Sequence, residues 1–203
     1  MGVLLQLSGT LSGSMSDILV NISDNLTLMR ISILCALVAS AGIVVLAVLL
    51  YTVLNKQNKI IALVALGWWL AEAIMLAVSQ IGAFALIPLS MKFIEAGAPE
   101  SSLYQTSGDF LYYGFDRQGL RLHMLFYCLG GIPWYYLFYK SKYVPRVISL
   151  YGLIAASVAL VGIVFEFFGH GVSIFIYLPL LPFELTIGVW LMLRGIRDGS
   201  ETK

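Results

Sequence analysis

Three glutamates lie inside long apolar stretches of the sequence, where a carboxylate has few groups to solvate it. They are Glu72, Glu166 and Glu184, and no Lys or Arg lies near the middle of the same stretches. A charged carboxylate inside hydrocarbon is costly, so each must be neutral, paired or facing water. Proton exchange and the binding of a small ligand are therefore the chemistry that these side chains could support.

Glu184 lies at the centre of the apolar stretch 173–195, on one helix face with Tyr177. At about 1.5 Å per residue, a helix of this length matches the hydrocarbon core of a bilayer. Pro179 and Pro182 leave backbone carbonyls free, and a neutral glutamic acid can donate a hydrogen bond to such a carbonyl. We therefore predict that Glu184 faces the interior of a helical bundle, toward its second or third span, and is neutral at pH 7.

Glu72 follows Trp68 by one helical turn, so the two share a face. Two interpretations of Glu72 and Glu184 stay open. In one, each is a neutral acid whose hydrogen bonds are satisfied inside the bundle. In the other, both line a water-filled pocket, with tyrosines, that binds a ligand or carries protons.

His123 and Tyr127 are four residues apart and share a helix face, while Glu166 shares a face with Gly162. Small residues favour close contact between helices, so Glu166 should face the bundle rather than lipid. We predict that Glu166 pairs with His123, or failing that with Arg121. Such a pair is compatible with a role in packing alone and with a proton or substrate site.

No metal and no cofactor are expected. A zinc site would need His123, Glu166 and a third ligand that the spacing does not supply. The sequence has no HExxH, Walker A, GxSxG or CxxC pattern. A binding or transport protein is therefore favoured over an enzyme, because a lipid-acting enzyme built on His123 and Glu166 lacks a visible nucleophile.

The composition is that of an integral membrane protein. Of the 203 residues, 60% are hydrophobic and 11% are charged, against roughly 45–50% and about 25% in soluble domains. A soluble core of this length could not bury so much apolar surface. The net charge of +1 gives no indication of nucleic-acid binding. Cys35 and Cys128 both lie in apolar stretches and are expected to be small buried hydrophobes.

The apolar stretches predict an all-α bundle of about five transmembrane helices within residues 30–197. The predicted spans are 31–54, 60–89, 119–139, 147–168 and 173–195. Residues 90–118, which contain acids, glycines and a proline, are predicted to form an exposed loop. Residues 1–29 form a segment without a span, and residues 198–203 a polar tail.

The basic residues are distributed unequally between the two sides of this arrangement. Eight of the twelve fall on one side: Lys56, Lys59, Lys140, Lys142, Arg146, Arg194, Arg197 and Lys203. The other side has Arg30, Lys92, Arg117 and Arg121. Because cytoplasmic loops carry the excess of Lys and Arg, we predict an N-terminus outside the cell, a C-terminus in the cytoplasm and residence in the cell (inner) membrane.

Three stretches together resemble a known family. They are Glu72-Ala73, the basic turn 139–146 (YKSKYVPR), and the stretch from Pro182-Phe183-Glu184 to residues 190–195 (WLMLRG). On these motifs the chain resembles, over roughly residues 20–197, the prokaryotic multi-pass membrane family called domain of unknown function four-three-eight-six. The resemblance implies a prokaryotic cell-membrane protein and no particular activity.

Two features depart from the family pattern. Members carry a further span at the N-terminus, which residues 1–29 do not provide, so a start that lacks this span is expected. Members also carry an Arg three residues before the helix-2 glutamate, where this chain has Trp69. An Arg–Glu pairing therefore cannot be transferred to this sequence.

The leading hypothesis is a membrane protein that binds a partner or a small ligand within its helical bundle. The candidate residues are Glu72, Glu184, Glu166, His123, Tyr127, Tyr177 and Trp68. The first alternative is a small proton-coupled transporter that uses Glu72 and Glu184. Five helices are few for a carrier, so this alternative calls for a homo-oligomer, and no inverted repeat is visible to support it.

Overall fold

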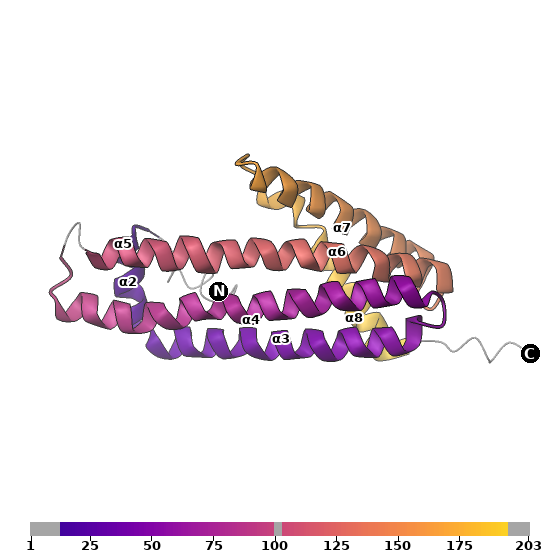
Figure 1. Cartoon of the computed structure of the whole chain (residues 1–203), viewed down its shortest axis with the longest axis horizontal. Helices are drawn as coiled ribbons and strands as arrows, with labels where there is room; N and C mark the ends of the chain where they lie inside the picture. Colours follow the sequence, from indigo (N-terminus) through magenta and orange to yellow (C-terminus); the bar gives the residue numbers. More distant parts are fainter. Residues whose placement is uncertain (1–12, 100–102, 195–203) are drawn as a thin grey trace, which may run out of the picture. The chain divides into compact units, whose positions relative to one another are not determined.

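The computed structural model describes residues 13–99 and 103–194, and within these ranges it is helical with no strand. The helices are α2 (Met15–Asp24), α3 (Leu26–Leu54), α4 (Lys59–Glu95), α5 (Leu103–Asp109), the π-helix η1 (Phe110–Arg117), α6 (Gln118–Ser141), α7 (Arg146–Phe167), the 3-10 helix η2 (Ile174–Ile176) and α8 (Leu180–Arg194) (Figure 1). The predicted tail 198–203, which contains Lys203, and the preceding basic residue Arg197 lie outside the described residues.

Four described segments are long and apolar enough to cross a membrane. They are Leu26–Leu54, Lys59–Glu95, Arg146–Phe167 and Ile174–Leu193. The remaining predicted span corresponds to α6, which has 24 residues but is less apolar because it is rich in aromatic residues and glycine. The chain is therefore an all-α membrane bundle, as its composition indicates.

The segment predicted as an exposed loop, 90–118, is mostly helical. Helix α4 continues to Glu95, and its 37 residues span about 55 Å, more than a bilayer's hydrocarbon core. The chain turns at Gly97 and Ala98, whose φ angles are +80° and +50°. Helices α5, η1 and α6 then follow one another without a break. The prediction was wrong because polar residues can also lie in helices: α4 continues to Glu95, and a second helical run begins at Leu103.

Helix α2 lies within the N-terminal segment that the sequence left without a span. Ser14 begins it with a capping box, in which Ser14 Oγ accepts from the Asp17 amide (3.3 Å) and the Ser14 amide donates to Asp17 Oδ2 (2.8 Å). These interactions satisfy amide groups that the first helical turn leaves free. Hydrogen bonds from the hydroxyl and then the amide of Ser14 also hold the pKa of Asp17 below its usual value.

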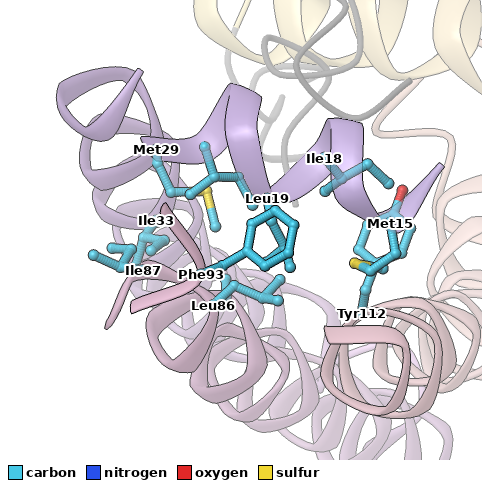
Figure 2. Packing of buried hydrophobic residues seen from close by; sticks show 11 residues of the cluster. Met15, Ile18, Leu19, Met29, Ile33, Leu86, Ile87, Phe93 and Tyr112 are labelled. Atoms are coloured by element: carbon cyan, nitrogen blue, oxygen red, sulfur yellow. The ribbon is translucent and has the colours of Figure 1, made fainter. Parts of the chain in front are cut away.

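The chain forms two compact units, and the division falls within α3, α4 and α6. The first consists of the described part of Met1–Ile43 and of Glu72–His123. Its apolar core contains α2 residues together with residues of α3, α4 and η1. Figure 2 shows Met15 and Leu19 of α2 in this core, with Phe93 of α4 and Tyr112 of η1. Helix α2 is thereby fixed against the ends of longer helices.

The second unit consists of Val44–Ala71 and the described part of Met124–Lys203. Its core joins α6, α7 and α8 through Tyr127, Cys128, Ala155, Ala159, Ile163 and Leu180. Gly152 of α7 lies under the ring of Phe183, where an added Cβ would come within 2.2 Å of a ring carbon. Of the two cysteines, Cys128 is buried as expected, whereas Cys35 is exposed on α3.

Candidate functional site: a buried carboxylate and imidazole

Glu72 of α4, which is buried, lies beside His123 of α6, which is half-buried, in the first unit. Glu72 Oε1 lies 3.7 Å from His123 Nδ1, and the side chains are 3% and 15% exposed. This separation is longer than a hydrogen bond. His123 Nδ1 has no hydrogen-bond partner among the described residues. The two groups are therefore close enough to interact electrostatically.

Glycines allow the helices around this pair to approach closely. A Cβ at Gly119 of α6 would lie 2.6 Å from the Ser79 Cβ on α4, and a Cβ at Gly82 of α4 would lie 2.9 Å from the Phe115 Cβ on η1. On the other side of α4, Ser40 of α3 donates a hydrogen bond of 2.8 Å to the carbonyl of Ala73. Glu72 is thus held where α3, α4 and α6 meet.

The sequence argument assigned His123 to Glu166 and left Glu72 without a basic neighbour. The structure places His123 beside Glu72 instead. The error came from the expected start of the third span at residue 119, which put His123 at a helix end. Because α5, η1 and α6 are continuous from Leu103, His123 lies well inside a long helical segment and can reach the interior of α4.

Glu166 has a different partner. Its Oε1 accepts a hydrogen bond of 2.9 Å from the Tyr177 hydroxyl, which joins the end of α7 to the residue after η2. Arg121, the second predicted partner of Glu166, donates to Gln118 Oε1 at 3.2 Å. Two candidate residues, Glu166 and Tyr177, are therefore brought together, in a contact that holds a turn.

Glu184 of α8 is exposed, and its carboxylate accepts a hydrogen bond from Tyr127 of α6. The Tyr127 hydroxyl is also 3.0 Å from the hydroxyl of Tyr135. The prediction that Glu184 faces the bundle interior is therefore wrong in part: the residue is exposed, although its carboxyl group is bonded to α6, the third predicted span, where it ends a chain of two buried tyrosines. Tyr135 was not identified from the sequence, although its spacing of eight residues from Tyr127 places both on one helix face.

The sequence predicted that Glu184 would donate a hydrogen bond to a carbonyl freed by Pro179 or Pro182. In the structure, the carbonyl groups of these two prolines accept hydrogen bonds from other hydroxyls. Tyr151 donates to the carbonyl of Pro179 at 2.9 Å, and Thr186 donates to that of Pro182 at 2.6 Å. Both donors lie within reach because Tyr151 belongs to the adjacent α7 and Thr186 follows Pro182 by one helical turn. The carbonyl groups are thus satisfied, and the hydrogen bond of Glu184 comes from a side chain.

Trp68 and Trp69 have different roles in the second unit. Trp68 is half-buried and its ring stacks on Phe126, with centroids 5.6 Å apart. Trp69 is buried against Gly130, where a Cβ would come within 2.3 Å of the indole. Its ring stacks on Tyr127 at 6.5 Å. Trp69, at the position where the family was expected to carry Arg, is thus a packing residue of this core.

Two further buried polar residues of the first unit were missed. Gln80 is 1% exposed and Asp116 is 3% exposed. Gln80 Nε2 donates to the Leu76 carbonyl and to Ser79 Oγ, while Gln80 Oε1 has no hydrogen-bond partner among the described residues. The spacing of eight residues between Glu72 and Gln80, close to two helical turns, could have indicated that both lie on one face.

Comparison with known proteins places this arrangement in a family. The family model named Domain of unknown function (DUF4386) matches residues 2–195. The chain belongs to this family. No curated protein and no solved structure is significantly similar to the chain. The resemblance inferred from three short motifs is thus confirmed, and the protein is an all-α membrane-type member of a family whose name assigns no activity. Within the described residues, no group of three or more His, Cys, Asp or Glu side chains could hold a metal ion.

Proposed function

We propose that this membrane protein binds a small ligand inside its helical bundle at Glu72 and His123, and that the ligand is a proton. The observation that carries the proposal is the 3.7 Å separation between Glu72 Oε1 and His123 Nδ1 in a buried environment. Ionisable groups within membrane helices are functional candidates because their burial is costly. Imidazole is also the side chain whose charge normally changes near neutral pH.

The geometry suits a pair with two states. When Glu72 is ionised and His123 is neutral, the pair carries a net negative charge that burial makes costly. When His123 takes up one proton from solution, the pair becomes neutral overall, and a charge-assisted hydrogen bond of about 2.7–2.9 Å can form between the imidazolium and the carboxylate. This length is nearly 1 Å shorter than the observed separation. Protonation would therefore draw the two side chains, and with them α4 and α6, slightly closer together.

The test uses the fact that the chain has only two histidines, His123 and His170. In a His170→Gln background, the ring-nitrogen signals of ¹⁵N-labelled histidine come from His123 alone and can be followed with pH in lipid nanodiscs. We expect one titration, displaced when Glu72→Gln removes the carboxylate. Glu166→Gln is the matched control and should leave the signal unchanged, because Glu166 accepts from Tyr177. A His123 signal that is constant between about pH 4 and 9, or is unaffected by Glu72→Gln, contradicts the proposal.

A proton-coupled carrier is the second candidate, and one observation favours it. Glu184 lies in another apolar helix with its carboxylate bonded to Tyr127, so a second protonatable group is available. Such a carrier would work as a homo-oligomer. In reconstituted vesicles, uptake driven by a pH gradient and abolished by Glu72→Gln and by Glu184→Gln supports transport. Proton binding without any gradient-driven uptake supports the first proposal alone.

A further inference from the structure

An apolar groove of about 520 Å³ opens on the second unit, between α7 and the chain that follows it. Its apolar walls come from Val158, Val161 and Phe165 of α7, and from Val172 and Ile176 on the other side. The volume falls within the range of about 300–1,000 Å³ that is typical of small-molecule sites.

Three local features build this groove. Gly162 lets η2 lie directly on α7, because a Cβ there would come within 2.9 Å of Ile176 Cγ2. The hydrogen bond from Tyr177 to Glu166 fixes the end of η2 to α7. Gly169 has a φ of +80°, which allows the chain to reverse after α7. The groove therefore follows from the backbone path and does not depend on one flexible side chain.

The floor of the groove offers little to a polar ligand. Ser157 lines it, but its hydroxyl already donates to the Leu153 carbonyl at 2.7 Å. Val158, Val161 and Phe165 are 44%, 55% and 52% exposed. They continue the exposed apolar face of α7, a helix long and apolar enough to cross a membrane. Because the groove is continuous with the exposed apolar face of a candidate membrane span, hydrocarbon is the occupant that matches it.

The groove has polar groups at one end. His170 and Ser173 line it there, and both are exposed in the turn between the candidate spans Arg146–Phe167 and Ile174–Leu193. A turn between two spans lies at the membrane boundary, which is the depth of lipid headgroups. An imidazole and a hydroxyl can both donate hydrogen bonds to a phosphate ester.

We propose that this groove binds one glycerophospholipid, with an acyl chain along Val158, Val161 and Phe165 and the phosphate at His170 and Ser173. The site differs from the surrounding lipid surface because it combines a preformed apolar channel with donors at headgroup depth. It is independent of the proton site, since none of its residues belongs to the Glu72–His123 pair.

The experiment uses phosphatidylglycerol that carries a photoactivatable diazirine on one acyl chain, in nanodiscs with the full-length protein. Crosslinked residues are mapped by mass spectrometry. We expect labelling to concentrate on Val158, Val161 and Phe165, several-fold above the exposed α7 residues Ile154 and Val164, which do not line the groove. Equal labelling of all exposed α7 positions would show ordinary boundary lipid and overturn the proposal.

Two variants test the occupancy of the groove and the headgroup contact. Val161→Trp should fill the groove and lower labelling there several-fold, while Val164→Trp makes the same change at an exposed position outside it and should not. His170→Gln should lower labelling by removing the imidazole. If the groove residues are labelled as strongly in Val161→Trp as in the parent, the channel is not the binding site. If labelling in His170→Gln equals that of the parent, the headgroup assignment is wrong.

Discussion

The carboxylate of Glu72 lies 3.7 Å from the imidazole of His123, and the side chain of Glu72 is buried while that of His123 is half-buried. An acid and a base enclosed together can exchange a proton without placing a net charge in hydrocarbon. This relationship separates Glu72 from Glu184, whose carboxylate is exposed and bonded to a tyrosine.

The first prediction concerns the coupling between these two residues. We expect Glu72→Leu to lower the stability of the protein, because it removes the carboxylate that lies 3.7 Å from the imidazole of His123. In a double-mutant cycle, Glu72→Gln and His123→Gln should be non-additive by about 0.5–3 kcal/mol. Denaturant unfolding in mixed micelles measures the free energies of unfolding of the parent, the two single variants and the double variant. Additive effects would show that the pair does not interact.

The second prediction tests the close approach of α4 and α6. Gly119→Ala places a Cβ 2.6 Å from the Ser79 Cβ, so we expect a loss of about 1–3 kcal/mol from overpacking. Gly67→Ala on α4 is the control, since no atom lies within 4 Å of its added Cβ. That variant should gain about 0.5–1 kcal/mol from helix propensity. Thermal unfolding compares the two, and equal midpoints would exclude this close contact.

The third prediction follows from the capping box of α2. Its hydrogen bonds lower the pKa of Asp17, so the stabilisation is present above the unfolded pKa and is lost as pH falls through the folded pKa. We expect the amides of α2 to lose protection in acid, measured by hydrogen exchange after correction for intrinsic rates. Asp17→Asn should remove most of this pH dependence. If the variant keeps it, another group is responsible.

The fourth prediction concerns Glu184, which we expect to be neutral at pH 7. Glu184→Gln should preserve folding, because an amide can still accept a hydrogen bond from Tyr127. Glu184→Leu removes the acceptor and should lower stability by about 1 kcal/mol. The infrared carboxyl band of the parent, assigned by its loss in Glu184→Gln, reports the charge directly. A carboxylate band at neutral pH would refute the neutral state.

The fifth prediction concerns orientation in the cell membrane. Gln57 Nε2 donates to the Tyr143 hydroxyl at 3.4 Å, so the turns around these two residues lie on the same side. Their basic residues predict that this side is cytoplasmic. Gln57→Cys and Ser141→Cys should resist an impermeant thiol reagent in intact cells, whereas Ala96→Cys should react. The parent, which contains Cys35 and Cys128, provides the background. The reverse labelling pattern would invert the topology.

The sequence alone was sufficient for the class of fold, because long apolar stretches interrupted by short basic turns can be satisfied only as membrane helices. It was also sufficient to identify the family. It predicted, too, that Glu72 and Trp68 lie on one helix face and that His123 and Tyr127 lie on another. Those inferences depend on local periodicity, which neighbouring residues along one chain determine.

The tertiary structure decided which of these faces meet. Local periodicity says which side of a helix is polar, but it gives neither the depth of a residue nor the helix opposite. Because α5, η1 and α6 are continuous, His123 lies inside a long helical segment and not at a helix end as predicted. Gly82 and Gly119 allow α4 to pack closely against this segment. Glu72 therefore became the partner of His123, and Glu166 that of Tyr177, because close packing between distant segments selects the contacts.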